Sequence, residues 1–389
     1  MSGRDLFCQP RRMRRGAALT LVFASVLVAG AATGTLPGGE QREPSPGSTR
    51  AAAPAGRHSE IAEAAAKAMA EGKSPVEAAE RAVSRSGNRW DAVYTEGEFE
   101  EFEESLDGEY TGVGLSARRE RDGRIEVTEV RTGSPAASAG IRAGDRLVRV
   151  DGAKVEGRPV TEVVSLLRGD ATDADAGSTV RLGLERGTRA WDTELRRARL
   201  TTDSVTVGEL ADGVTVIRIA AFTKGSGKAV REAVEAVPAD SGIVLDLRGN
   251  SGGLVTEAVT AASAFLDGGL VATYDVDGEQ QALHAESGGD TTRPLVALVD
   301  GGTMSAAELV TGALQDRGRA VVVGSRTFGK GSVQMPTELP DGSVAELTVG
   351  HYRTPAGRGV DGRGITPDLE ADEHALDRAE TVLTGLGQS

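Results

Sequence analysis

A serine and a lysine stand 25 residues apart in this 389-residue chain, each shortly after an apolar segment that predicts a buried strand. Ser305 follows the segment 294–299 and begins a predicted helix over 306–315. A serine at a helix N-terminus is a candidate nucleophile, because the helix dipole and the free N–H groups stabilise negative charge. Ser305 to Glu308 also fit a capping box, which places serine at helix starts for structural reasons alone. Both interpretations stay open at this point.

Few other side chains could serve as nucleophile, base or metal ligand. The single cysteine, Cys8, lies close to the N-terminus, which excludes an intrachain disulfide, a cysteine zinc site and a cysteine nucleophile in the folded body. The four histidines are His58, His284, His351 and His374, and none lies in a motif suited to a Ser–His–Asp triad. No His, Asp or Glu cluster has metal-ligand spacing, so we expect no metal and no cofactor.

Lys330 follows the predicted strand 320–324 in a glycine-rich loop that imitates a phosphate-binding loop. The spacing Gly324-x4-Gly329-Lys330 matches a Walker A motif, but Gly331 stands where Ser or Thr is required. The residues 333–336 also predict no helix to face a phosphate. These two departures argue against an NTPase and leave Lys330 as a reacting group or a solvated loop charge.

A second glycine-rich turn follows the apolar strand 243–247. The sequence Asp246-Leu247-Arg248-Gly249-Asn250-Ser251-Gly252-Gly253-Leu254 leads into a predicted helix over 255–266. Such a turn exposes backbone N–H groups that bind phosphate or an oxyanion. A plain strand-to-helix turn that needs glycine for a positive φ fits equally well.

Residues 107–187 predict a separate, small β-rich module. Gly112-x-Gly114 resembles a dinucleotide fingerprint, but an acidic segment precedes it and an alternating strand over 124–130 follows. Gly112, Val113, Gly114 and Leu115 instead suit a loop whose N–H groups receive a carboxylate. With the helix start at Ser134-Pro135 and an amphipathic helix over 159–168, the module resembles a PDZ domain of the bacterial protease-associated type. The alternative is a β-rich domain without a ligand.

Ser305, Lys330 and the Asn250-x-Gly252-Gly253 turn together resemble the carboxyl-terminal processing peptidases, also called tail-specific proteases. The resemblance covers roughly residues 88–370 and includes Phe328 to Gln334, Tyr352 to Arg358 and Gly362 to Asp368. Two departures are mild, since Ser251 replaces the usual proline and the approach to Ser305 is less Ser-rich. Neither removes a reacting group.

The resemblance implies roles for the residues that match its motifs. Ser305 would attack the peptide carbonyl and Lys330 would accept its proton, which requires burial to lower the lysine pKa. Gln334 would hydrogen-bond to the amine and orient it. The N–H groups of Ala306 and of Gly252 or Gly253 would form the oxyanion hole. Asp316 falls on a family position, and we expect it to support structure, because a carboxylate beside Lys330 would raise that pKa.

The implied fold is an α/β peptidase core of the crotonase or Clp-protease type, with an inserted PDZ domain and a small N-terminal helical element. The expected boundaries are 1–36 for a signal peptide or membrane anchor, 37–57 for a linker, 58–106 for the helical region, 107–187 for the PDZ domain, 188–370 for the protease domain and 371–389 for a C-terminal segment. Within the helical region, Ser74-Pro75-Val76-Glu77 predicts the start of a second short helix.

Composition and the N-terminus constrain location and partners. The chain is 39% hydrophobic and has a net charge of −14, although its first fifteen residues carry five arginines. An acidic body is a poor nucleic-acid binder, so we expect protein or peptide substrates with free C-terminal tails. The arginines precede an uncharged stretch over 16–37, which predicts a secretory signal or an uncleaved membrane anchor. Either would place the folded part outside the cytoplasm.

The sequence thus predicts an extracytoplasmic serine endopeptidase of the C-terminal processing type. The rival interpretations are a catalytically inactive PDZ adaptor and, with less support, an acyl-CoA enzyme of the crotonase type. Intact Ser305, Lys330 and Gln334 argue against the adaptor. The sequence leaves open whether a partner protein activates the enzyme, whether the N-terminal segment attaches it to a membrane, and which proteins it cleaves.

Overall fold

The structure is a computed structural model that describes residues 54–120, 122–169, 176–210, 213–276, 279–372 and 374–386. The predicted signal or anchor segment and most of the predicted linker lie outside these residues. No helix in the described ranges combines the length and the apolar character that a membrane span needs. The described residues form two compact units, one over Thr111–Leu200 and the other from the chain on either side of it.

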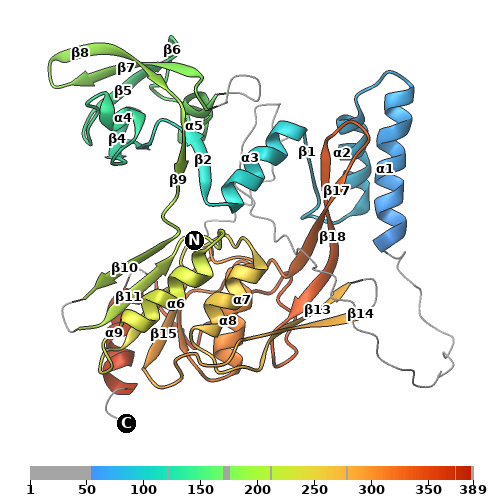
Figure 1. The fold of residues 1–389 in the computed structure, drawn as a ribbon, viewed down its shortest axis with the longest axis vertical. Coiled ribbons are helices and arrows are strands. Elements are labelled where there is room, and N and C mark those ends of the chain that lie inside the picture. The colour runs from blue at the N-terminus through green and yellow to red at the C-terminus, as the bar shows by residue number, and fades with distance from the viewer. Residues whose placement is uncertain are drawn as a thin grey trace, which may run out of the picture. The chain divides into compact units, whose positions relative to one another are not determined.

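The Thr111–Leu200 unit is a small β-rich domain with its own core (Figure 1). Its sheet has the strand order β3-β4-β5-β7-β8, with β6 paired to β5. The elements are β3 (Leu115–Arg119), β4 (Ile125–Val130), α4 (Pro135–Ser138), β5 (Arg146–Val150), β6 (Ala153–Lys154), α5 (Val160–Arg168), β7 (Thr179–Arg186) and β8 (Arg189–Arg196). Alternating buried residues of β4, such as Ile125 and Val127, pack against α5 residues such as Val163. A further pair, β2 (Glu109–Gly112) with β9 (Ala198–Thr201), stands where the chain enters and leaves this unit.

The centre of the other unit is a six-stranded sheet with the order β10-β11-β12-β15-β16-β19. Its strands are β10 (Val205–Glu209), β11 (Thr215–Ile219), β12 (Ile243–Asp246), β15 (Leu295–Val299), β16 (Val321–Gly324) and β19 (Leu369–Glu370). All neighbours are parallel except β10 and β11. Runs such as Leu295–Val299 are buried throughout, as expected for strands covered on both faces.

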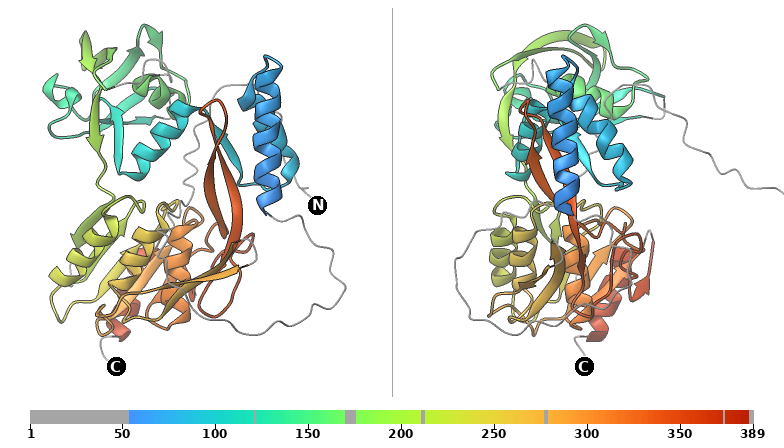
Figure 2. Two further views of the ribbon diagram at one scale, coloured as in Figure 1. Left: turned by 45° about the vertical axis from the view of Figure 1, so that its right-hand side comes forward. Right: turned by 90° about the vertical axis from the view of Figure 1, so that its right-hand side faces the viewer.

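Helices cover both faces of this sheet. Helices α6 (Ser226–Ala236), α7 (Val255–Ser263) and α8 (Ala306–Asp316) share one core with residues such as Ile217, Leu245 and Ala297. Helix α9 (Ala375–Leu386) packs on the other face, against Val244, Val296 and Val323 (Figure 2). The carboxyl ends of β12, β15 and β16 therefore meet at one edge, where parallel α/β sheets build their sites.

A second sheet carries the N-terminal helices. Strand β18 (Val344–Arg353) pairs with β17 (Ser332–Glu338), β1 (Ala92–Tyr94) and β13 (Leu270–Val276), and β13 pairs with β14 (Glu279–His284). Helices α1 (Pro54–Ala70) and α2 (Pro75–Ser86) lie alongside the β17–β18 hairpin, as Figure 2 shows. Helix α3 (Glu96–Leu106) follows β1.

These elements confirm the predicted α/β core, the separate β-rich module and the N-terminal helical element. The predicted second helix begins where the sequence placed it, since the Ser74 side chain accepts from the Glu77 N–H at 3.2 Å and Pro75 is the first helical residue. The predicted helix start after Ser305 is likewise present as α8.

Candidate active site

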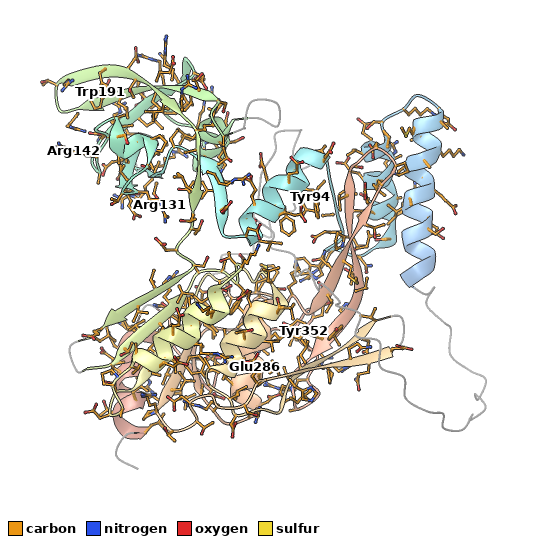
Figure 3. All side chains as sticks on the ribbon, viewed as in Figure 1. Tyr94, Arg131, Arg142, Trp191, Glu286 and Tyr352 are labelled. Carbon is orange, nitrogen blue, oxygen red and sulfur yellow. The ribbon has the colours of Figure 1, made fainter. Side chains whose placement is uncertain are left out.

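Ser305 lies at the sharp bend between the loop after β15 and helix α8, and it is fully buried. Its φ of 55° lies in a region that non-glycine residues rarely adopt. Only Asp151 shares a positive φ among the described non-glycine residues. The neighbouring Met304 N–H donates to the Asn250 carbonyl at 2.8 Å, and the Tyr352 hydroxyl of β18 (Figure 3) donates to the Ser305 carbonyl at 3.0 Å. Such a conformation persists only where the surroundings hold it.

The buried carboxylate of Glu308 joins this bend to the loop that carries Lys330. Its Oε2 accepts the Ser305 N–H at 2.9 Å and the Lys330 N–H at 2.8 Å. Its Oε1 accepts the Gly329 N–H at 2.7 Å and the Thr327 hydroxyl. Burial raises the pKa of Glu308, although these hydrogen bonds oppose the rise. One oxygen thus fixes the backbones of both predicted reacting residues.

Lys330 is fully buried, and this changes the acidity of its amine. Burial lowers the pKa of Lys330 to about 8, against an opposing effect of the Glu346 charge. Desolvation disfavours the ammonium form, which is the effect a lysine base requires. The predicted burial of this lysine is therefore confirmed. The side chain of Phe328, two residues before Lys330, is 44% exposed.

Trp90, from the segment before β1, provides the aromatic surface beside the lysine. The Lys330 Nζ lies 5.4 Å from the Trp90 ring centroid, a distance suited to a cation–π contact. The Trp90 ring also lies 5.5 Å from the ring of Phe328, and its indole N–H donates to Asp361 at 3.2 Å. The N-terminal region therefore contributes directly to the surroundings of Lys330.

The Gly252-Gly253 turn lies against Ser305. A Cβ added to Gly252 would come within 3.0 Å of the Ser305 Cβ, so only glycine fits this approach. The Gly252 N–H donates to the Asn250 Oδ1 at 2.9 Å. The residues on either side of Gly253 bond to Phe222: the Gly252 carbonyl accepts the Phe222 N–H, and the Leu254 N–H donates to the Phe222 carbonyl. The N–H of Gly253 itself therefore points away from Phe222. Of the two glycines predicted for an oxyanion hole, Gly252 already donates its N–H to Asn250, so Gly253 is the remaining candidate donor.

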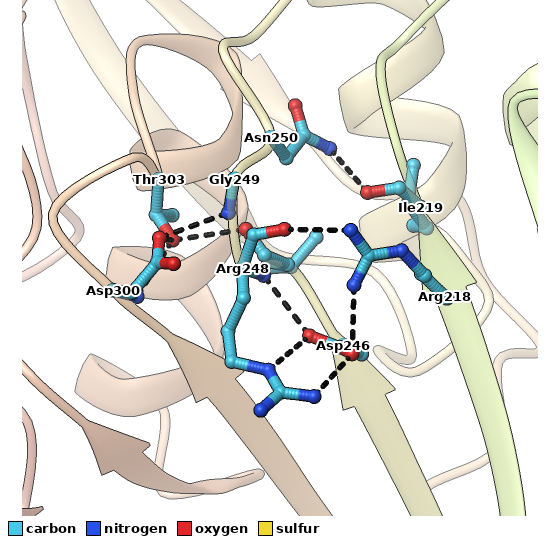
Figure 4. Close-up of polar contacts among 9 residues, drawn as sticks. Arg218, Ile219, Asp246, Arg248, Gly249, Asn250, Asp300 and Thr303 are labelled. Atoms are coloured by element: carbon cyan, nitrogen blue, oxygen red, sulfur yellow. Dashed lines mark hydrogen bonds and ion pairs between the residues drawn. The ribbon is translucent and has the colours of Figure 1, made fainter. Parts of the chain in front are cut away.

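A network of hydrogen bonds and ion pairs holds this turn in place (Figure 4). Burial raises the pKa of Asp246, but hydrogen bonds from Arg248 and the charges of Arg248 and Arg218 outweigh it, so the net shift is downward. The Asp300 Oδ1 accepts the Gly249 N–H at 2.9 Å, which ties the turn to the loop before Ser305. The Asn250 side chain donates to the Ile219 carbonyl at 2.9 Å, which connects the same turn to β11.

Two other residues singled out in the sequence have structural contacts. The Gln334 amide donates to the Trp90 carbonyl, and its buried Oε1 has no hydrogen-bond partner among the described residues. Its orienting role for Lys330 stays a prediction. Asp316, at the end of α8, accepts the Ala356 N–H at 2.8 Å and pairs with Arg358, so it supports the loop after β18.

In the other unit, the predicted peptide-binding residues lie where β2 ends and β3 begins. Gly114 has φ 77°, and a Cβ there would come within 2.2 Å of the Ser134 Cβ. The carbonyls of Val113 and Gly114 accept the N–H groups of Ala136 and Arg131, both at 2.9 Å. Strand β3 is the edge of its sheet, and an edge strand is where an extended peptide can add.

Sequence reasoning missed three contributors to the site: Trp90, Tyr352 and Glu346. It also interpreted Glu308 only as a helix cap. The sequence does show the capping spacing of Ser305 and Glu308 and the motif that begins at Tyr352. Neither pattern predicts that these side chains contact residues of other loops or strands. No sequence signal linked Trp90 or Glu346 to a lysine that is 240 or 16 residues away.

A serine at a strained helix start and a buried lysine, in an α/β core with a separate β-rich module, define a serine-peptidase fold that carries a PDZ unit. Comparison with known proteins agrees. Residues 213–371 match the family model of Peptidase family S41, and residues 126–186 match that of the PDZ domain.

Individual relatives give the same result. The chain is 33% identical over 276 residues to the carboxy-terminal processing protease CtpA of Bacillus subtilis (strain 168), covering 70% of this chain and 58% of that protein. It is 32% identical over 295 residues to a carboxy-terminal-processing protease of Bartonella bacilliformis, covering 74% and 67%. A solved photosystem II D1 C-terminal processing protease has 30% identity and a TM-score of 0.51, covering 80% and 86%.

The chain belongs to peptidase family S41, among the carboxy-terminal processing peptidases. It spans somewhat more than half the length of the B. subtilis relative. The predicted family and the predicted PDZ insertion are both confirmed.

We expect Glu308→Gln to lower the free energy of unfolding by about 3 kcal/mol, because an amide nitrogen would face buried N–H donors and leave them unsatisfied. Chemical denaturation measures this. The matched control is Glu257→Gln in α7, since Glu257 accepts two N–H groups at 2.9 and 2.8 Å but is less buried. Its expected loss is about 1 kcal/mol. Equal losses for both variants would contradict the bridging role of Glu308.

Proposed function

We propose that this chain is an extracytoplasmic serine endopeptidase in which Ser305 and Lys330 form the catalytic dyad. The observation that carries the proposal is the fully buried Lys330, whose pKa of about 8 allows a neutral amine near physiological pH. Glu308 supports it by holding the backbones of the two residues on one oxygen.

In the proposed mechanism, Lys330 removes the proton from the Ser305 hydroxyl as the oxygen attacks a peptide carbonyl. Negative charge then develops on the carbonyl oxygen at the N-terminus of α8. The N–H groups of Ala306 and Gly253 are the oxyanion donors. Losing one such donor typically lowers the rate about 100- to 1,000-fold. The lysine ammonium then gives its proton to the leaving amine, and water hydrolyses the acyl-enzyme.

Gln334 is the proposed orienting residue for the amine. Its free Oε1 is an available acceptor for an N–H of Lys330, and its amide is already anchored on Trp90.

The proposed substrates are proteins whose free C-terminal tails bind the PDZ unit. The edge strand β3 and the loop over Gly112, Val113, Gly114 and Leu115 support an added peptide strand with its carboxylate at the loop. The arginine-rich start and the apolar stretch after it support secretion or membrane attachment, and an activating partner protein is compatible with this arrangement.

Ser305→Ala and Lys330→Ala should each lower the cleavage rate at least about 1,000-fold, since the first removes the proposed nucleophile and the second removes the proposed base. The assay is cleavage of an unstructured protein with an apolar C-terminal tail. Lys228→Ala, which removes an exposed lysine of α6, is the control and should keep full activity. An active Lys330→Ala variant would refute the dyad.

Cleavage should become faster as the pH rises, because the proposed base is the neutral amine of Lys330. Below pH 8 the amine of Lys330 is mostly protonated and cannot accept the serine proton, so kcat/KM should rise with pH through about 8. Activity measured after return to a common pH controls for irreversible loss. A limb with its midpoint near pH 6.5 would indicate a histidine base instead.

Tail capture predicts that the free carboxylate matters. The Ser305→Ala chain, which cannot turn over, should bind an apolar-tailed peptide at least about tenfold more weakly when its C-terminus is amidated, because the loop N–H groups lose a charged acceptor. Isothermal titration measures both affinities, with a charged-tail peptide as the specificity control. Equal affinity for acid and amide would argue for side-chain binding alone.

A further inference from the structure

Several buried polar atoms on one face of the β17–β18 hairpin have no hydrogen-bond partner among the described residues. They are the Gln334 Oε1, both carboxylate oxygens of Glu346 and the Thr348 hydroxyl. Gln334 pairs with Thr348 across the hairpin, and Pro336 pairs with Glu346. Directly opposite residues share a face of a sheet, so these side chains lie on the same side. The intervening Ala345 and Leu347 pack on the opposite side, in the core with α1 and α2.

This face belongs to the surroundings of Lys330. Strand β1 pairs with β18 so that Ala92 is opposite Glu346. Trp90, two residues before Ala92, contacts both the Lys330 amine and the Gln334 amide. Glu346 is fully buried, and no hydrogen bond joins it to Lys330 in the part of the chain that the structure describes. Burial raises the pKa of the Glu346 carboxyl to about 7 against the opposing charge of Lys330, and the Glu346 charge in turn acts to raise the pKa of Lys330.

The other titratable groups around Lys330 and Glu346 are either protonated or hydrogen-bonded to other residues. Tyr94 of β1 has its pKa raised by burial and by the charges of Glu346 and Glu98, so it stays protonated. Glu308 accepts the Lys330 backbone N–H, and Asp361 accepts the N–H groups of Gly331 and Trp90. Three further charged groups lie close by. Arg89 stacks on Trp90, Asp91 accepts the Thr348 N–H, and His351 of β18 lies 3.8 Å from Asp361.

We propose that Glu346 is a positioning residue for Lys330, whose carboxylate stabilises the ammonium that forms when Ser305 loses its proton. This inference rests on the proposed Ser–Lys mechanism. In the step concerned, the Ser305 O–H bond breaks, an N–H bond forms on the Lys330 amine, and the serine oxygen bonds to the substrate carbonyl carbon. The electron pair of that carbonyl moves to its oxygen. Above about pH 8, where Lys330 is neutral, Glu346 is ionised because burial raises its pKa only to about 7, and in this step it neither gives nor takes a proton.

The location of Glu346 explains how one pocket can satisfy two opposed needs. Burial favours the neutral lysine before attack, and a carboxylate in the same dry pocket favours the charged lysine after it. A buried carboxylate with no donor is unfavourable by itself, so the lysine ammonium is also the group that stabilises Glu346. Because the two charges interact, their titration belongs to the pair.

The activity test compares Glu346→Gln with wild type. Without the carboxylate the pKa of Lys330 should fall further, so the acidic limb of kcat/KM should move down by about one pH unit. The plateau kcat should fall about tenfold, because the new ammonium loses its counter-charge, while KM should change little. Thr348→Val, which alters the same buried face without a charge, should shift neither quantity. A merely structural role for Glu346 would leave the limb in place.

A second measurement does not depend on peptidase activity. In the Ser305→Ala chain with isotope-labelled lysine, NMR titration of the Lys330 side chain, assigned with Lys330→Arg, reports its pKa directly. We expect a midpoint near pH 8 that falls by at least about half a unit when Glu346→Gln is added. Glu346→Met, of similar size, replaces the Gln variant if that one does not fold. An unchanged midpoint would overturn the inference, whereas a shifted midpoint in a chain that cleaves nothing would refute the proposed function alone.

Discussion

The carboxylate of Glu308 is the interaction on which the rest of the site depends. Four donors from two separate loops converge on it, including the backbone N–H groups of Ser305 and Lys330. A buried carboxylate must find such donors, because its desolvation is otherwise costly. The same requirement therefore stabilises the strained serine bend and fixes the lysine loop beside it. Preorganisation of this kind lets a site act without reorganising during the reaction.

Around this bridge, the fold creates a dry pocket for a charged side chain. The lysine loop lies at the carboxyl end of β16, Trp90 covers it from the N-terminal region, and β18 closes it with Glu346 and Tyr352. Elements from both ends of the unit are thus needed to exclude water from one amine. This explains why α1 and α2, which contribute no reacting group, pack on the hairpin that forms a wall of the pocket.

The PDZ unit is built differently. Its core is closed by its own strands and by α5, and its candidate site is an edge strand with a glycine loop whose geometry is fixed locally by Ser134. A peptide strand added at such an edge would be bound backbone to backbone, which tolerates many sequences, whereas the proposed Ser305 chemistry requires particular side chains at particular positions. In the sequence, the first site is therefore marked mainly by glycine positions and strand pattern, and the second by particular reactive side chains.

The sequence by itself determined the local features of this protein. Buried strands such as 294–299, the helix starts after Ser74 and Ser305, and the glycine turn at Gly252-Gly253 all follow from short-range patterns, because capping, periodicity and backbone freedom act over a few residues. Only the tertiary structure decided which groups surround Lys330. The contacts of Trp90, Tyr352 and Glu346 cross between strands distant in sequence, and the shift in the lysine pKa depends on how completely those elements exclude water. Burial is a property of the assembled fold, and no residue carries it alone.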